Sequence, residues 1–377
     1  MAEPLKNLID ADAVGAISHH LHRVWTGFDH RAFTRQALAG LDALELKARV
    51  MQAAGALVAA LPADVDRAAG ILEASLGPAG AGDDLAGLRT SAAGLAGWPV
   101  WPLTEAITLL AARQHPARGL QALHAMTQRL TAEFAIRPFL IHHPEIGFAT
   151  LARWVNDPSA HVRRLVSEGS RPRLPWGLRL QALVADPAAT LPLLAQLQDD
   201  GSGYVRRSVA NHLNDIAKDH PAVLVQWLQN HLPDATAARQ QMLRHACRTL
   251  VKAGHPQVLQ AWGLGAPFKG QAALQLSSAQ VQLGSGVALK LALKSTSPDA
   301  QNLVVDYAVH HVKANGSTSA KVFKGWKLQL PAGGTVQLSK QHAVRPISTR
   351  SYHAGWHAVQ VQINGSVVAE TGFDLLL

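Results

Sequence analysis

The feature that most constrains the fold of this chain is a segment that occurs twice. Residues 157–169 (DPSAHVRRLVSEG) align without gaps to residues 200–212 (DGSGYVRRSVANH) at an offset of 43 residues, and Pro144 matches Pro187 at the same offset. A period of about 40 residues with two helices per unit is typical of HEAT-like repeats. We therefore predict a curved solenoid of stacked helix pairs, in which the second helix of each pair lines a concave face.

The same helical pattern extends over the first 264 residues. Apolar residues recur at every third or fourth position, which indicates helices with one buried face. Clear examples are residues 45–61, 102–114, 116–130 and 222–232. The dipeptide His-Pro begins at residues 115, 143, 220 and 255, and proline in a first helical turn is a signal for a helix start. We assign residues 1–264 to the solenoid.

The pattern changes after this region, where apolar and polar side chains alternate with the period of a half-buried strand. The alternating runs include residues 273–283, 287–295, 302–312 and 357–363. Asn364-Gly365 lies between two such runs and is a strong signal for a tight hairpin. About seven short antiparallel strands without a helix signal predict an all-β immunoglobulin-like sandwich, which we assign to residues 265–377.

Composition narrows the expected cellular compartment of the protein and the class of its binding partner. The single cysteine, Cys247, excludes an internal disulfide and a cysteine-based zinc site. No run approaches the roughly 20 apolar residues that a membrane-spanning helix needs, and the first residues resemble no secretion signal, so we expect a cytoplasmic protein. The net charge of +9 favours a polyanionic partner, and the segment from residue 266 onward carries ten Lys and Arg against four Asp and Glu.

The two Val-Arg-Arg triplets are candidates for phosphate binding. Each is expected to start a second helix after a turn capped by Ser159 or Ser202, where free N–H groups and the positive end of the helix dipole meet two guanidinium groups. The four side chains are Arg163, Arg164, Arg206 and Arg207. The alternative is a pair of solvated arginines that bridges to a neighbouring repeat, and it is less favoured because the triplet occurs at two equivalent positions.

Three carboxylates fall in the corresponding helices. Glu168 stands just before Gly169, at the negative end of its helix, where a carboxylate is locally unfavourable. Such local violations often mark functional sites. Asp215 lies in the equivalent helix one repeat later, and Glu133 is expected to open the corresponding helix of the preceding unit. We therefore predict that the three meet on one concave face, with arginines at its rim.

Each of these residues also has a simpler interpretation. Glu168 could pair with Arg164 four residues earlier, and Asp215 with Lys218 three residues later. Glu133 could be an ordinary acidic residue in a first helical turn. Trp176, which follows a proline, could be a hydrophobic plug between repeats. Taken together, however, the carboxylates and arginines suit a partner that is anionic along its backbone and cationic at one point, as alkylated DNA is.

Three segments carry a resemblance to a known family. Residues 131–140 (TAEFAIRPFL), 162–176 (VRRLVSEGSRPRLPW) and 204–221 (YVRRSVANHLNDIAKDHP) closely resemble the AlkC family of DNA alkylation-repair glycosylases. The resemblance covers nearly the whole chain, because some members carry a C-terminal immunoglobulin-like domain. It implies a bacterial, nucleoid-associated, monofunctional glycosylase that removes N3-methyladenine, with N3-methylcytosine as an additional substrate class, without flipping the base. Glu133, Glu168, Trp176 and Asp215 occupy the positions that line the family's active site.

The expected chemistry follows from the charge of the lesion. An N3-alkylated base leaves as a neutral molecule and needs no general acid. Asp215 and Glu168 are then assigned to the sugar cation and the attacking water, in an order that the sequence leaves open. Trp176 would pack on the deoxyribose or base, and Glu133 would complete the acidic cluster. We expect no cofactor, no metal site, no obligate protein partner and a monomer.

Further DNA contacts are expected outside the triplets. Double-stranded DNA with alkylated bases is the predicted partner, and a basic sandwich loop would grip it from the far side. The additional candidates are Arg171, Arg173, Lys340, Arg345, Arg350 and His353. Two rival functions stay open. A DNA-binding scaffold without catalysis would have no need of three carboxylates beside its arginines, and a protein adaptor would expose apolar rather than basic patches.

Overall fold

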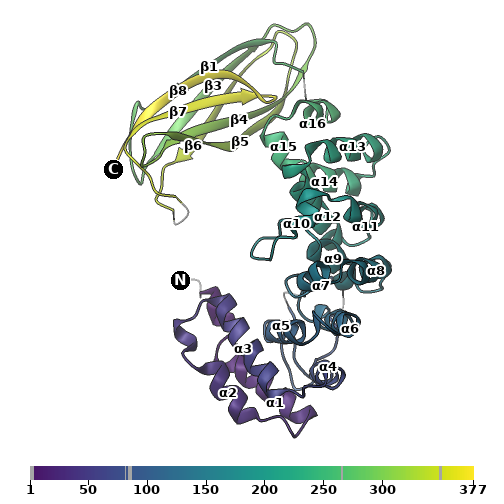
Figure 1. Ribbon diagram of the computed structural model, residues 1–377. Coiled ribbons are helices and arrows are strands. Elements are labelled where there is room, and N and C mark those ends of the chain that lie inside the picture. The colour runs from purple at the N-terminus through teal and green to yellow at the C-terminus, as the bar shows by residue number, and fades with distance from the viewer. Residues whose placement is uncertain (1–3, 81, 84–86, 265, 348–349) are drawn as a thin grey trace. The chain divides into compact units, whose positions relative to one another are not determined.

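The structure is a computed structural model that describes residues 4–80, 82–83, 87–264, 266–347 and 350–377. Contacts within it divide the chain into two units (Figure 1). The first contains Met1–Asp219 and Ala235–Ala246, and the second contains His220–Asp234 and Cys247–Leu377. The first unit is helical, whereas the second joins three helices to all the described strands.

The helices of the first unit are mostly short. They are α1 (Ala11–Val24), α2 (His30–Leu38), α3 (Leu46–Ala60), α4 (Val65–Ala74), α5 (Val100–Ala111), α6 (Pro116–Thr127), α7 (Arg137–His142), α8 (Pro144–Trp154), α9 (Ala160–Gly169), α10 (Gln181–Ala185), α11 (Leu191–Leu197), α12 (Gly203–Asp219) and α14 (Ala237–Ala246). Three 3-10 helices accompany them, η1 (Leu5–Leu8), η2 (Leu41–Ala43) and η3 (Ala188–Thr190).

The predicted HEAT-like solenoid is confirmed. In Figure 1 the helices of the first unit alternate between two rows, with α6, α8 and α11 in one row and α5, α7, α9 and α12 in the other. The repeated valines explain the regular packing of α9 against α12, because Val162 and Val166 are buried in one helix and Val205 and Val209 at the equivalent positions of the other. Burial of one such side chain contributes about 1.5–3 kcal/mol.

Proline starts helices where the sequence predicted it. Pro116, Pro144, Pro221 and Pro256 each stand at the first turn of a helix, where the missing N–H costs no hydrogen bond. The match of Pro144 to Pro187 is looser than expected. Pro187 precedes the 3-10 helix η3, and the α-helix begins only at Leu191.

The second unit contains α13 (Pro221–His231), α15 (Arg248–Lys252), α16 (Pro256–Ala261) and the strands. The strands are β1 (Gly270–Leu276), β2 (Gln280–Gln282), β3 (Gly286–Ser295), β4 (Gln301–Val312), β5 (Thr318–Leu330), β6 (Thr335–Ala343), β7 (Gly355–Ile363) and β8 (Ser366–Leu376). Secondary structure therefore changes between Ala261 and Gly270. The domain boundary after residue 264 stays a prediction, because the contacts assign helices before that point to the second unit.

The strands form a sandwich of two sheets, as predicted. One sheet has the order β1-β3-β6 and the other β2-β8-β7-β4-β5. Apolar side chains from both sheets, among them Leu289, Leu291, Val305 and Phe373, form the core between them. The described residues contain eight strands, in agreement with the expectation of about seven. One pairing departs from the expected antiparallel order, because β2 pairs with β8 in parallel.

The Asn364-Gly365 hairpin is confirmed. Both residues have positive φ, 50° and 84°, as a tight turn between β7 and β8 requires. Gly365 also lies against the backbone of Gly254, where a Cβ atom on Gly365 would come within 2.6 Å of the Gly254 Cα. Glycine at this position therefore serves the turn and a close backbone approach.

Candidate active site

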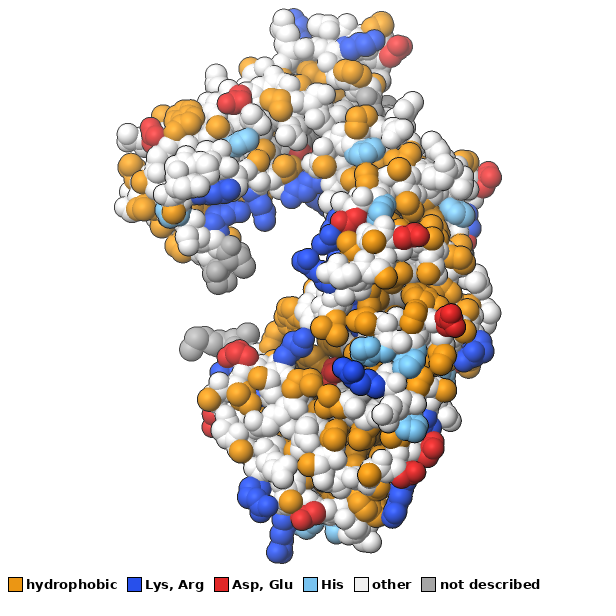
Figure 2. Space-filling model, viewed as in Figure 1, with side chains coloured by type: hydrophobic (Ala, Val, Ile, Leu, Met, Phe, Trp, Pro, Cys, Tyr) orange, Lys and Arg blue, Asp and Glu red, His pale blue; other side chains and the backbone are white. Residues whose placement is uncertain are grey.

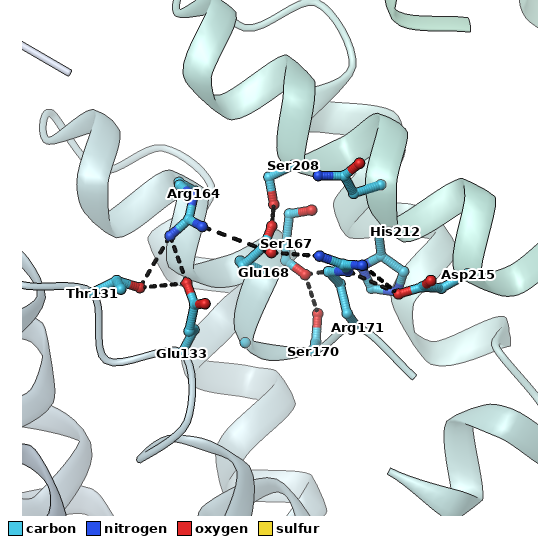
Figure 3. Close-up of polar contacts among 12 residues, drawn as sticks. Thr131, Glu133, Arg164, Ser167, Glu168, Ser170, Arg171, Ser208, His212 and Asp215 are labelled. Carbon is cyan, nitrogen blue, oxygen red and sulfur yellow. Dashed lines mark hydrogen bonds and ion pairs between the residues drawn. The ribbon is translucent and has the colours of Figure 1, made fainter. Parts of the chain in front are cut away.

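Acidic side chains from three segments of the solenoid meet in one hydrogen-bonded network (Figure 3). Glu133 comes from the turn before α7, Glu168 from the last turn of α9, and Asp215 from the last turns of α12. Glu168 is only 5% exposed and Asp215 only 1%. The expectation that Glu133 opens a helix was wrong, because α7 starts at Arg137.

Two arginines lie among these carboxylates. Arg164 Nη1 donates to Glu133 Oε2 at 2.8 Å, and its Nη2 is 3.7 Å from Glu168 Oε1. Arg171 Nη1 donates to Glu168 Oε1 at 2.6 Å, and its Nε donates to Asp215 Oδ2 at 2.8 Å. For these two side chains, the expectation that arginines lie at the rim was wrong. They tie the three carboxylates together from within, and Arg171 is the nearer partner of Glu168.

Three further donors complete the network. Ser208 Oγ donates to Glu168 Oε2 at 2.6 Å, and Thr131 Oγ1 donates to Glu133 Oε2 at 2.8 Å. Lys218 Nζ donates to Asp215 Oδ1 at 2.7 Å, which is the pair that the sequence offered as the simpler interpretation of Asp215. Both oxygens of the two most buried carboxylates are therefore hydrogen-bonded, as buried charges need to be.

Neighbouring charges set the pKa values of Glu168 and Arg164. Burial alone would raise the pKa of Glu168, but the charges of Arg164 and Arg171 and a hydrogen bond from Ser208 outweigh it and hold the pKa below its ordinary value. Burial alone would lower the pKa of Arg164, and the carboxylates of Glu133 and Glu168 raise it above the ordinary value. The carboxylate of Glu168 is thus ionised at neutral pH.

Arg137 is a member of this region that the sequence reasoning missed. Its guanidinium is fully buried, its Nη1 donates to the carbonyl of Gly169 at 2.8 Å, and its Nε donates to the carbonyl of Leu178. Burial and the nearby Arg171 lower the pKa of Arg137 to about 10, so it is still charged at neutral pH. The available signal was a lone charge in an otherwise apolar stretch, FAIRPFLI.

His212 is a second missed residue. It is fully buried on α12, and its Nδ1 lies 2.9 Å from the carbonyl of Ser167 on α9. Burial lowers the pKa of His212 to about 4, so the ring is neutral at neutral pH and Nδ1 donates to the carbonyl. This hydrogen bond links the backbone beside Glu168 to the helix that carries Asp215.

The side chain of Trp176 is exposed to solvent rather than buried. It is 63% exposed, in the loop between α9 and α10, so the interpretation as a hydrophobic plug was wrong. Its φ is 64°, a conformation that bulky residues rarely adopt. The backbone carbonyl of Trp176 accepts a hydrogen bond from Lys47 Nζ at 2.8 Å.

The turns before α9 and α12 contain aspartates where phosphates were expected. Asp157 Oδ1 accepts from the N–H of Ser159 and Asp200 Oδ1 from that of Ser202, both at 2.8 Å. Ser202 caps its helix, since its Oγ accepts from the N–H of Tyr204 at 3.1 Å, but Ser159 makes no side-chain cap hydrogen bond. The predicted cap at Ser159 was therefore wrong.

The other four solenoid arginines that were predicted to bind DNA have different surroundings. Arg163 donates to both oxygens of Asp200, at 2.6 and 3.0 Å, which is the bridge between repeats that the sequence offered as an alternative. Arg206 is half-buried and donates to the carbonyl of Asp200. Arg173 pairs with Asp219 at 2.6 Å, and Arg207 is exposed. Their role in phosphate binding stays a prediction.

The basic side chains predicted in the sandwich occupy varied surroundings. Lys340 lies on β6 rather than in the loop after it, and its Nζ is 5.8 Å from the ring centre of Trp326. Arg345 is exposed, whereas Arg350 is half-buried against His311 at 2.6 Å. His353 is half-buried, and residues 348–349 of the same loop lie outside the described residues. From residue 266 onward the sequence has ten Lys and Arg against four Asp and Glu, and Figure 2 shows Lys and Arg side chains on the face of the strands in view.

Over the described ranges, no group of three or more His, Cys, Asp or Glu side chains is arranged to hold a metal ion. None of the helices that the structure describes is both long and apolar enough to cross a bilayer.

Comparisons with known proteins agree with this geometry. Residues 271–377 match a family described as the C-terminal Ig-like domain of the uncharacterised protein YhaZ. The uncharacterized protein YhaZ of Bacillus subtilis (strain 168) is 37% identical over 268 residues, 69% of this chain and 72% of that protein.

A solved structure matches the whole chain. It is the alkylpurine DNA glycosylase AlkC of Pseudomonas fluorescens, bound to DNA containing an abasic site analog, with a TM-score of 0.90 and 34% identity over 100% of both chains. The helical solenoid, the Ig-like sandwich and the level of identity to both relatives lead to one conclusion. The chain belongs to the AlkC family, together with YhaZ.

Proposed function

We propose that this protein is a DNA glycosylase that hydrolyses the N-glycosidic bond of cationic alkylated bases, chiefly N3-methyladenine and also N3-methylcytosine, without flipping the base. The observation that carries the proposal is the meeting of Glu133, Glu168 and Asp215 in one network, beside a loop that displays Trp176. A likeness over the full length to an alkylpurine DNA glycosylase supports the same activity.

The chemistry needs charge stabilisation more than proton transfer. The alkylated base is already positive, so it departs as a neutral molecule, and positive charge passes to the deoxyribose as the bond breaks. Carboxylates fixed in a nearly dry site stabilise that charge more strongly than water would. Glu168 and Asp215 are the best placed for this role and for positioning the attacking water, because both are buried and held rigidly by Arg171.

One cation of the network can leave without disturbing the rest. Lys218 is 42% exposed in its side chain and holds Asp215 Oδ1, whereas Arg171 is 8% exposed and holds Oδ2. A DNA phosphate can attract the exposed ammonium away at low cost, which frees Oδ1 to face the sugar while Arg171 keeps the carboxylate in place. Trp176 packs against the deoxyribose or base, and Glu133 holds Arg164.

The basic side chains outside the network position the duplex by its phosphates and read no sequence. In the solenoid, exposed Arg207 is the strongest candidate, because Arg163 already binds Asp200. In the sandwich, Arg345 is exposed in the same way. Partially exposed Arg173, Arg206, Lys340, Arg350 and His353 supply further contacts once their present partners are displaced.

The test is to incubate methylated duplex DNA with the protein and to identify the free bases by chromatography. We expect N3-methyladenine in the soluble fraction, N3-methylcytosine from substrates that contain it, and abasic sites in the DNA. Binding of the methylated DNA without release of any base would reject this proposal and favour the non-catalytic scaffold instead.

A further inference from the structure

In the turn that carries Trp176, a bulky residue stands at a position where the backbone geometry favours glycine. The N–H of Gly177 donates to the carbonyl of Leu174 at 3.2 Å and closes a four-residue turn. Pro175 at its second position and a φ of 64° at its third make it a type II turn. That third position normally takes glycine, because any larger residue is strained there. The chain instead has Trp176 at this position and glycine one residue later.

Such strain persists only where neighbouring groups determine the conformation. From one side, Arg137 donates to the carbonyls of Gly169 and Leu178 and so holds both ends of the loop. From another side, Lys47 Nζ donates to the carbonyl of Trp176 itself, at 2.8 Å, across a sequence separation of 129 residues. The peptide group after the strained residue is therefore fixed by a side chain from α3.

Lys47 is an unusual residue for its place in α3. It stands in the first turn of the helix, where the macrodipole disfavours a cation. The carboxylate of Glu105 on α5 attracts it, and its Nζ lies 6.0 Å from the ring centre of Phe134. Phe134 is the neighbour of Glu133, and its ring stacks on Trp101, which donates to Glu105 at 3.1 Å. The ammonium group thus connects the turn of Glu133 with the turn of Trp176.

We propose that Lys47 is a positioning residue, which holds the carbonyl of Trp176 so that the exposed indole faces the nucleotide in the active site. This role rests on the proposed glycosylase function, in which Trp176 packs against the deoxyribose or base. Lys47 acts through Trp176 and touches no reacting atom.

The first test is a double-mutant cycle on single-turnover excision of N3-methyladenine. Lys47→Met keeps the aliphatic stem and removes the donor, so the rate should fall about threefold to tenfold, the range expected for one hydrogen bond. Lys47→Arg keeps a donor and should recover most of that loss. In a Trp176→Ala background the further change Lys47→Met should cost less than about twofold, because the two residues act as one unit.

A matched control separates this effect from loss of charge. Lys6→Met removes another cation from the same end of the chain, which pairs with Glu45 at 3.4 Å, and it should leave the rate unchanged. Equal losses from Lys47→Met in both backgrounds would overturn the proposal, and so would an equal loss from Lys6→Met.

A second measurement does not depend on activity. The emission of Trp176 is obtained as the difference between protein with and without the change Trp176→Phe, and its anisotropy is compared before and after Lys47→Met. We expect lower anisotropy, because the turn loses the hydrogen bond from Lys47 to the carbonyl of Trp176. Unchanged anisotropy would reject the role of Lys47. If the unaltered protein released no base, the proposed function would fail, and this measurement would still decide whether Lys47 fixes the turn.

Discussion

Val162-Arg163-Arg164 and Val205-Arg206-Arg207 are the same tripeptide in the first turns of α9 and α12, yet their last arginines have different surroundings. Arg164 lies inside the acidic network, with only 16% of its side chain exposed, whereas Arg207 is exposed. Four residues after Arg164 stands Glu168, and four residues after Arg207 stands Asn211. The repeat therefore fixes where the helices lie, and residues outside the shared motif decide what each arginine does.

The two arginines therefore have different proposed roles. The arginine of α9 balances the buried carboxylates that are proposed to act on the sugar, and the arginine of α12 is free to meet a phosphate. Stability should depend on the first, and the salt dependence of DNA binding on the second. Substitutions at equivalent positions can separate these two roles.

The largest expected effect is on stability. Arg164→Met removes the main partner of Glu133 and one partner of Glu168, and breaking a buried ion pair costs about 3 kcal/mol or more. Arg207→Met, the matched control, should change stability by no more than about 0.5 kcal/mol. Urea unfolding followed by circular dichroism measures both. Equal changes in the two variants would mean that the triplets are equivalent after all.

The pH dependence of stability should change in the same pair of variants. The pKa of Glu168 is lowered in the folded protein, so its ion pairs stabilise the fold above the ordinary carboxylate pKa of about 4.3, and this contribution is lost as the pH falls through the lower folded value. Without Arg164 the folded pKa lies nearer the ordinary value, so this contribution is smaller and its loss is complete at a higher pH. Tm between pH 3 and pH 7 tests this, and parallel profiles for Arg164→Met and Arg207→Met would contradict it.

The salt dependence of DNA binding should depend on the arginine of α12 and not on Arg163 of α9. Arg207→Met should reduce the slope of log Kd against log salt by about one unit, because one phosphate contact is lost. Arg163→Met should leave the slope unchanged, since Arg163 already binds Asp200. Fluorescence anisotropy with a labelled duplex at several salt concentrations provides the slopes. A smaller slope for Arg163→Met alone would assign the phosphate to α9 instead.

The smallest expected effect tests whether the residue four positions after each arginine decides what that arginine binds. Asn211→Glu gives Arg207 the carboxylate that Arg164 has in Glu168. The new pair should stabilise the helix by about 0.2–0.5 kcal/mol and lower the affinity for DNA slightly, because it competes with a phosphate for Arg207. Asn211 also contacts His245 at 3.0 Å, so Asn211→Gln serves as the control. Unchanged affinity in the glutamate variant would show that Arg207 does not meet DNA.

The sequence predicted the architecture well because repeats and alternation act through backbone geometry and burial. The 43-residue offset, the His-Pro helix starts and the Asn364-Gly365 turn all correspond to observed elements. No individual alternating run was assigned to β5 or β6, whose residues are largely exposed or only partly buried. The parallel pairing of the three-residue β2 leaves no local signature at all.

Side-chain partners were harder to predict. That Glu133, Glu168 and Asp215 would meet followed from the repeat, but the position of Arg171 between two of them depends on a loop with no repeated counterpart. The burial of Arg137 and the link from Lys47 to Trp176 join segments far apart in the chain. Contacts of this kind are set by tertiary packing, which local patterns do not encode.

In the proposed mechanism, carboxylates of α9 and α12 stabilise positive charge on the sugar of a damaged nucleotide. The most direct test is single-turnover excision of N3-methyladenine by the variant Asp215→Asn, alongside its affinity for lesion DNA. Because the amide retains the shape and loses the charge, we predict a rate lower by a factor of about 100 or more, with affinity nearly unchanged. A variant that excises the base at the rate of the unaltered protein would contradict the account.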